Sequence, residues 1–255
     1  MNLKVLYEDN HLIVVYKESG ILAQADISGD PDLLTITKDY IKVKYEKPGA
    51  VYLGLVHRLD RNTTGLMVFA RTSKAASRLS EQIKNHSFSK KYLCVCEGHL
   101  AGKARLENYL YFDERQKKSF VTNENNGKKA ILDYEALEYT KLNGKEYTLV
   151  NINLQTGRHH QIRCQLASLG YPLYGDVKYG AHDKLGNYYA LKNYELSFVH
   201  PTTKENLTFL YYKPEKIFAN FSENIIEKYN LEPSNYIVDL LYEALIYESN
   251  NKRNA

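Results

Sequence analysis

The spacing of apolar residues along the chain predicts more strands than helices. Short runs rich in β-branched and aromatic residues are separated by turn-forming Gly, Pro, Asn and Asp. Other stretches have apolar residues at helical spacing, the clearest beginning after Asp32. The predicted helices are 33–45, 73–85 and 159–169. The predicted strands are 3–7, 12–16, 51–56, 67–70, 91–96, 130–139, 146–154, 188–198 and 206–212, with a hairpin around 114–120.

The connections between the predicted strands are mostly short. Short connections favour antiparallel pairing over βαβ units, which need a long crossover. One connection contains Asn143-Gly144, a pair that tolerates the positive φ of a tight hairpin turn. We therefore expect an α+β fold, with a mostly antiparallel mixed β-sheet and flanking helices.

The charge of the chain changes sign near residues 214–220. Residues 221–255 carry six acidic and three basic side chains, a balance of −3, so the +4 of the whole chain leaves +7 on residues 1–220. The last segment also has an apolar stripe at helical spacing, formed by Ile237, Leu240, Leu241, Ala244 and Leu245. We expect a main domain at 1–220 and a C-terminal helical extension at 221–255 packed on it.

Three cysteines, Cys94, Cys96 and Cys164, are too few and too irregularly spaced for a disulfide framework. They indicate a reduced, intracellular chain. No apolar run is long enough to span a bilayer, so we expect a cytoplasmic protein without a membrane partner. The basic main domain is compatible with RNA, but many metabolic enzymes are equally basic.

Residues 57–66, with the sequence HRLDRNTTGL, carry the clearest candidate chemistry. Asp60 lies between Arg58 and Arg61, on a loop after a predicted strand, where catalytic groups are often found. Nearby guanidinium groups favour an ionised carboxylate, which suits a nucleophile or a base. The alternative is a turn in which the aspartate bonds its own backbone and the arginines face solvent.

Residues 154–163, with the sequence LQTGRHHQIR, form a second candidate. A glycine turn followed by a cation-rich helix start makes an anion site. The alternative is a solvated basic helix end. We expect no metal here, because the adjacent His159 and His160 diverge around a helix and no third ligand stands at a usable spacing.

Tyr92 follows two lysines at the start of a predicted strand. Its ring is a candidate for contact with a flat base, and the alternative is an ordinary tyrosine at the edge of the core.

Taken together, four segments resemble the RluA family of RNA pseudouridine synthases in order and spacing. They are residues 17–24, 57–71, 91–98 and 155–180, and the resemblance extends over about residues 3–212. The family pattern HRLDxxTSGL is matched with Thr64 in place of serine and Asn62 in place of a common aspartate. Residues 17–20, KESG, depart from the usual KPAG. The resemblance implies the pseudouridine synthase fold with a central RNA-binding cleft.

The resemblance also implies roles for individual residues. Asp60 falls at the catalytic aspartate, Tyr92 at a tyrosine that packs against the target uracil and transfers a proton, and Arg163 at the basic residue that pairs with the aspartate. Arg58 falls at an arginine that takes the place of the flipped nucleotide. The other residues expected to bind RNA are His57, Thr64, Arg158, His160 and Gln161.

The implied reaction converts uridine to pseudouridine in ribosomal RNA, in particular that of the large subunit, or in transfer RNA. It needs no cofactor and no metal. Asp60 either attacks C1′ or removes the C2′ proton, and the sequence leaves both routes open. We expect a monomer without the S4 RNA-binding module of some relatives, because the matching region begins near Leu3.

Two other classes of function fit parts of the sequence. One is an RNA-binding or ribosome-assembly protein with a dormant site. The other is a hydrolase that uses Asp60 as a nucleophile on a small molecule, which predicts ligand binding insensitive to salt. RNA binding should instead weaken steeply as salt rises.

Overall fold

A computed structural model describes residues 3–186 and 188–222. Nearly all of the expected extension at 221–255 lies outside these residues. The helices are α1 (Leu33–Lys44), α2 (Ser73–Lys84) and α3 (Gln161–Ser168), with 3₁₀ turns η1 (Val177–Tyr179) and η2 (Lys216–Asn220). The strands are β1 (Lys4–Glu8), β2 (Leu12–Lys17), β3 (Gly54–Leu55), β4 (Thr64–Ala70), β5 (Ser89–Glu97), β6 (Lys103–Asp113), β7 (Lys118–Thr122), β8 (Lys128–Leu142), β9 (Lys145–Leu154), β10 (Leu191–Val199) and β11 (Asn206–Leu210).

All the strands of the described residues belong to one mixed sheet. Its order is β1-β2-β4-β10-β5-β9-β8-β6-β7, with β11 beside β10 and β3 beside β4. The pairing of β4 with β10 is parallel, and the other pairings among these strands are antiparallel. The predicted α+β class and mostly antiparallel mixed sheet are confirmed.

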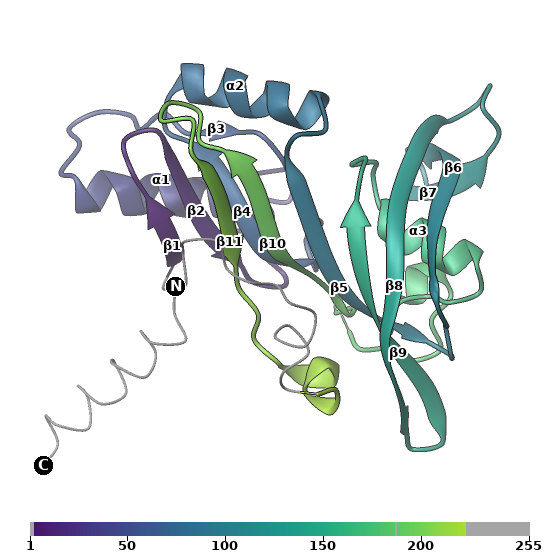
Figure 1. Ribbon diagram of the computed structural model, residues 1–255. Helices are drawn as coiled ribbons and strands as arrows, with labels where there is room; N and C mark the ends of the chain where they lie inside the picture. The colour runs from purple at the N-terminus through teal and green to yellow at the C-terminus, as the bar shows by residue number, and fades with distance from the viewer. Residues whose placement is uncertain (1–2, 187, 223–255) are drawn as a thin grey trace, which may run out of the picture.

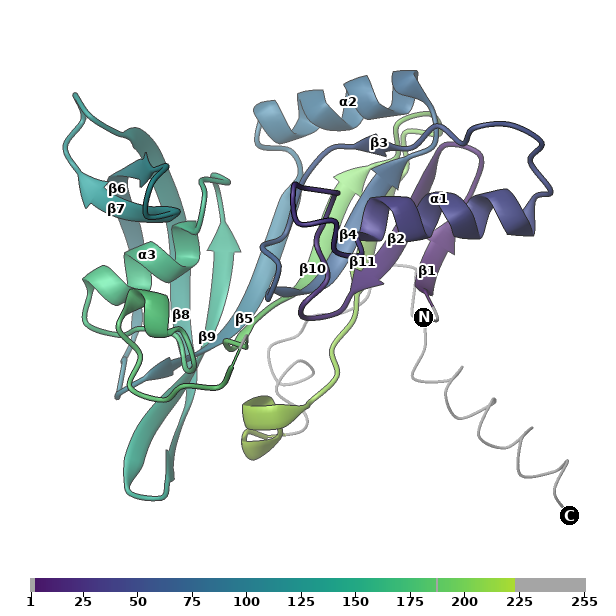
Figure 2. The same cartoon turned by 180° about the vertical axis from the view of Figure 1, so that it is seen from behind.

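Strand β5 joins two halves of the sheet (Figures 1 and 2). Its first residues pair with β10, and its last residues pair with β9. The first half consists of β1–β4, β10 and β11 with α1 and α2. The second half consists of β6–β9 with α3 beside it. Chain segments from both halves therefore meet along β5.

The core of the first half lies on both faces of the sheet. In β4, Met67 and Phe69 pack toward the α1 side, whereas Leu66, Val68 and Ala70 pack toward the α2 side. Burial on both faces explains why this strand is apolar throughout instead of alternating. Side chains of Asp32 and Thr72 cap α1 and α2 by accepting backbone N–H bonds, which fixes where both helices begin.

Several predicted boundaries were wrong, and three of them bear on the site. The strand expected at 51–56 shortens to β3, which pairs with β4 only at Phe69 and Ala70, while β10 pairs with the start of β4 at Thr64 and Gly65. Strand β4 itself begins at Thr64, earlier than predicted. Helix α3 begins at Gln161, because His160 has a left-handed backbone with φ of 51°.

All three cysteines are free and buried. Over the described residues, every helix is too short or too polar to cross a lipid bilayer.

Candidate active site

Asp60 lies on the loop between β3 and β4. The segment after β2 supports this loop, because the Lys17 ammonium donates to the Arg61 carbonyl at 2.7 Å and the Gly20 N–H donates to the same oxygen at 3.0 Å. Burial lowers the pKa of Lys17 to about 7, although the charge of Asp60 acts in the opposite direction. The KESG segment therefore holds the aspartate loop through main-chain carbonyls.

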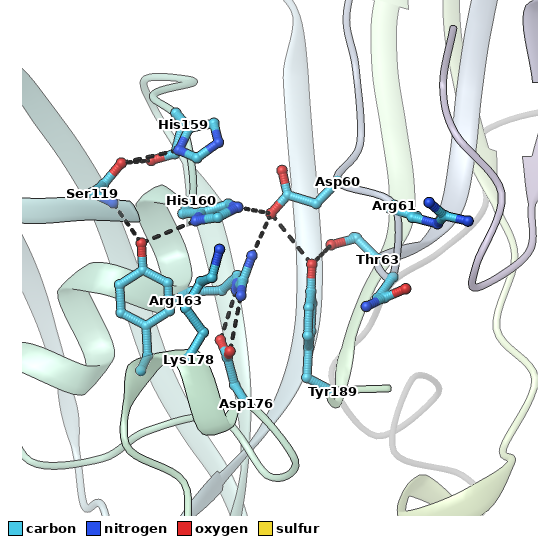
Figure 3. Close-up of polar contacts among 12 residues, drawn as sticks. Asp60, Arg61, Thr63, Ser119, His159, His160, Arg163, Asp176, Lys178 and Tyr189 are labelled. Carbon is cyan, nitrogen blue, oxygen red and sulfur yellow. Dashed lines mark hydrogen bonds and ion pairs between the residues drawn. The ribbon is translucent and has the colours of Figure 1, made fainter. Parts of the chain in front are cut away.

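One carboxylate oxygen of Asp60 receives all the contacts that the structure gives this side chain (Figure 3). Its Oδ2 lies 3.2 Å from Arg163 Nη1, 3.3 Å from the Tyr189 hydroxyl and 3.6 Å from His160 Nε2. Within the described residues, Oδ1 has no hydrogen-bond partner, and the side chain is 30% exposed. The carboxylate is thus fixed by one oxygen and open at the other.

Arg163 reaches Asp60 from the first turn of α3, and the predicted contact between them is present. The buried guanidinium is oriented by Asp176, with Nε and Nη2 donating at 2.6 and 2.9 Å to its two carboxylate oxygens. Burial alone would lower the pKa of Arg163, but the hydrogen bond with Asp176 and the neighbouring negative groups outweigh it and raise that pKa. Arg163 is therefore a permanent cation aimed at Asp60.

His160 faces the same oxygen as a neutral ring. Burial, followed by the positive charge of Arg163, lowers its pKa to about 3, against the opposing effect of Asp60. Its Nδ1 lies 3.0 Å from the Tyr179 hydroxyl, which accepts the Ser119 N–H at 2.8 Å. This chain of bonds favours a proton donated by Tyr179 to Nδ1, and leaves the ring proton on the Nε2 that faces Asp60.

Tyr189 approaches Asp60 from the side opposite His160 (Figure 3). Its hydroxyl donates to Asp60 Oδ2 and lies 3.1 Å from Thr63 Oγ1, which is buried. The ring also lies under the Arg163 guanidinium, 4.2 Å from its carbon to the ring centroid. Tyr189 therefore contacts both the carboxylate and its cationic partner.

The sequence did not single out Tyr189, Asp176, Tyr179 or Thr63. Asp176 and Tyr179 lie in the matched block 155–180, so their segment was recognised without their contacts. Tyr189 joins Asp60 across 129 positions, a separation that apolar spacing cannot reveal.

Of the residues expected to bind RNA, Arg58 and Arg158 are exposed. Three others, His57, Gln161 and Thr64, are buried in the protein. His57 Nε2 accepts the Val68 N–H at 3.0 Å, and the Gln161 amide bonds Thr156, the Arg158 N–H and the Ile131 carbonyl. Thr64 is 6% exposed and begins β4. These side chains shape the two loops, and their contact with RNA stays a prediction.

Tyr92 also differs from the expectation of a ring presented to a base. It is only 5% exposed and belongs to a core cluster with Leu59, Ile152 and Tyr189. Burial raises the pKa of its phenol, and the charge of Asp60 raises it further. The phenol therefore lies within electrostatic reach of Asp60 while its ring is covered.

The fold is shared with known structures of one class. The human RNA Pseudouridylate Synthase Domain Containing 1 superposes with a TM-score of 0.67 at 22% identity, covering 84% of each chain. This class combines a mixed sheet with flanking helices, as seen here.

Sequence comparison identifies the family. A model of the RNA pseudouridylate synthase family matches residues 11–168, and the chain belongs to this family. It is 30% identical over 241 residues to ribosomal large subunit pseudouridine synthase D of Zymomonas mobilis, covering 89% of this chain and 74% of that protein. It is 29% identical over 223 residues to tRNA pseudouridine synthase C of Haemophilus influenzae, covering 81% and 91%. For other relatives the chain spans as little as 54% of their length.

Proposed function

We propose that this protein is an RNA pseudouridine synthase that isomerises specific uridines in structured RNA. The observation that carries the proposal is the geometry of Asp60, whose Oδ2 is held by Arg163 while Oδ1 has no partner among the described residues. The membership of the family gives the reaction to which this geometry is applied.

The proposed reaction breaks the N1–C1′ bond of uridine, turns the uracil and joins C5 to C1′. The proton on C5 is lost at the end, and N1 gains one. Asp60 either attacks C1′ or removes the C2′ proton, and both routes need a charged carboxylate with an accessible oxygen. Oδ1 is the oxygen that meets this need, because Oδ2 already receives Arg163 and Tyr189.

The target nucleotide must leave the base stack to reach Asp60, at a cost of a few kcal/mol. We propose that Arg58, exposed two residues before Asp60, fills the space that the nucleotide vacates. Tyr92 is proposed to contact the uracil and to transfer a proton, which requires a movement that uncovers its ring. Stacking on a tyrosine is worth about 1–3 kcal/mol per base and would offset most of the cost of flipping.

The substrate is proposed to be ribosomal RNA, in particular that of the large subunit, or transfer RNA. The names of the two relatives support these two classes of RNA. The expected central RNA-binding cleft is part of the same proposal. The exposed Arg58 and Arg158, on the two loops that meet at Asp60, give it a basic border.

The test is the substitution Asp60→Asn, assayed by tritium release from bulk unmodified RNA labelled at C5 of uridine. We expect release to be abolished and RNA binding to be retained, because the amide keeps the shape of the side chain and loses its charge. Asp30→Asn is the matched control, since Asp30 is an exposed carboxylate 2.7 Å from Arg61 in the neighbouring loop.

If Asp60→Asn releases tritium at the rate of Asp30→Asn, Asp60 is not the catalytic residue. A wild-type protein that binds RNA and releases no tritium from either RNA class would instead point to an RNA-binding protein with a dormant site.

A further inference from the structure

Lys90 differs from the other buried Lys and Arg side chains in the part of the chain that the structure describes. It lies in β5, two residues before Tyr92, and only 8% of it is exposed. Among the described residues, no hydrogen bond or ion pair reaches its ammonium group. In contrast, Arg163 is bonded to Asp176, Lys17 to two main-chain carbonyls, and Lys192 to the Lys213 carbonyl and Glu215.

The ammonium of Lys90 lies beside the second loop that carries an RluA-type motif and within electrostatic reach of the first. A Cβ added to Gly157 would lie 3.5 Å from Lys90 Nζ, so the second motif passes directly beside it. The charge of Lys90 also contributes to lowering the pKa of His57, which starts the first motif. The next residue in each loop is an exposed arginine, Arg58 or Arg158.

Most of the Lys90 side chain is covered, while its ammonium reaches solvent, because Nζ is not one of the described polar atoms that are fully buried without a partner. A partly desolvated cation gains free energy when an anion pairs with it. Burial is the only resolved influence on Lys90, and it lowers the pKa of the side chain. The adjacent Lys91 points to the other face of β5 and has a carboxylate, that of Glu195, at 3.0 Å. Lys90 therefore has an ammonium that no anion among the described residues neutralises and that an external anion can reach.

We propose that Lys90 binds a phosphodiester group of the RNA backbone beside the target nucleotide, between the Arg58 and Arg158 loops. The absence of a side chain at Gly157 leaves that side of the ammonium open to an oxygen. The inference rests on the proposed function for the identity of the polyanion. Lys90 makes no contact with Asp60, so it serves the binding of RNA and not the bond-breaking step.

The substitution Lys90→Met tests the proposal in the full-length protein, with Lys74→Met as the control. Lys74 is an exposed lysine of α2, so both variants lose one positive charge. For Lys90→Met we expect KM for bulk unmodified RNA to rise by about tenfold, the loss of one charge-assisted contact. The slope of log affinity against log salt should become shallower by about one. Lys90→Arg should recover most of the affinity.

A Lys90→Met protein with the affinity and salt slope of the control would overturn the inference. So would a variant whose loss falls on kcat with KM unchanged. Affinity and its salt slope are measured by RNA binding without turnover, so the first of these outcomes stands even if no tritium is released. An absence of tritium release would count against the proposed function. Equal affinity of Lys90→Met and the control would count against the phosphate site.

A second measurement needs no variant. Acetylation of Lys90 in the wild-type protein, followed by mass spectrometry, should be suppressed by RNA, whereas acetylation of Lys74 should not. Inorganic phosphate at the same concentration of phosphate groups should protect Lys90 weakly. Equal protection by inorganic phosphate, or none by RNA, contradicts the assignment to the RNA backbone.

Discussion

The two oxygens of the Asp60 carboxylate have different environments. Three donors from two parts of the chain approach Oδ2, and they are the side chains of Arg163, Tyr189 and His160. A carboxylate held in this way cannot rotate freely, so its open oxygen points in a fixed direction. The orientation of Oδ1 is thus as much a product of the surrounding side chains as of the loop itself.

Tyr189→Phe should lower kcat by about tenfold, because one hydrogen bond to a charged group is lost while the ring and its contact with Arg163 remain. KM for RNA should change little. Tritium release at saturating RNA measures the effect, with Tyr188→Phe as the control, since that ring stacks with Lys216 instead. Equal rates for the two variants would show that Tyr189 does not orient the carboxylate.

At the scale of single residues, the sequence predicted the Asp60–Arg163 pair but not the side chains that orient it. Asp60 and Arg163 were found because each sits in a dense local motif. Asp176 and Tyr189 become visible only when the chain is folded, since their contacts depend on the path between η1 and β10. The burial of His57, Gln161 and Tyr92 was also beyond reach, because polar residue types suggest exposure and only tertiary packing decides it.

At the scale of the elements, the backbone of β4 approaches that of β10 closely near the site. Gly65 lies opposite Asn193 in the parallel pairing with β10, at a φ of 129°. A Cβ at this position would lie 2.1 Å from the Asn193 carbonyl oxygen, which is backbone and cannot swing away. The glycine that follows the aspartate motif is therefore required for the strand that leads out of the loop.

Gly65→Ala should lower the free energy of unfolding by about 2–4 kcal/mol, through backbone strain and loss of the β4–β10 contact. Urea unfolding of the purified protein measures this. Gly49→Ala is the control, because a Cβ there meets nothing within 4 Å. A Gly65→Ala protein as stable as the control would mean that β4 and β10 can separate at little cost.

Most elements were predictable from local patterns, and the exceptions have tertiary causes. The Asn143-Gly144 hairpin and helix α1 agree with the sequence because turn chemistry and capping are local. The short β3 and the left-handed His160 do not, since the pairing of β4 with both β3 and β10 and the chain path into α3 are not visible in local patterns. The expected docking of residues 221–255 stays a prediction.

At the scale of the whole molecule, two buried histidines make the free energy of unfolding depend on pH. Burial lowers the pKa of His57 to about 3, and that of His160 also to about 3. Near pH 5 the folded protein keeps both neutral, whereas the unfolded chain protonates them below a pKa of about 6.5. The unfolded state then binds more protons, so the free energy of unfolding falls as pH falls below 6.5.

His57→Gln should remove one of these two contributions. The free energy of unfolding of the wild type minus that of the variant should decrease by about 3 kcal/mol as the pH falls from 6.5 to 4, at 1.36 kcal/mol per pH unit. Urea unfolding over this pH range gives the difference, and the exposed His86→Gln is the control. A difference between wild type and His57→Gln that is constant with pH would contradict a neutral buried ring.

The position of β10 between β4 and β5 sets the order in which a growing polypeptide can complete this sheet. During synthesis, β4 and β5 emerge from the ribosome about a hundred residues before the strand that separates them, and each then carries an unpaired edge open to association with other chains. Tyr189 is translated immediately before β10, so this donor to the Asp60 carboxylate arrives together with the strand that closes these edges.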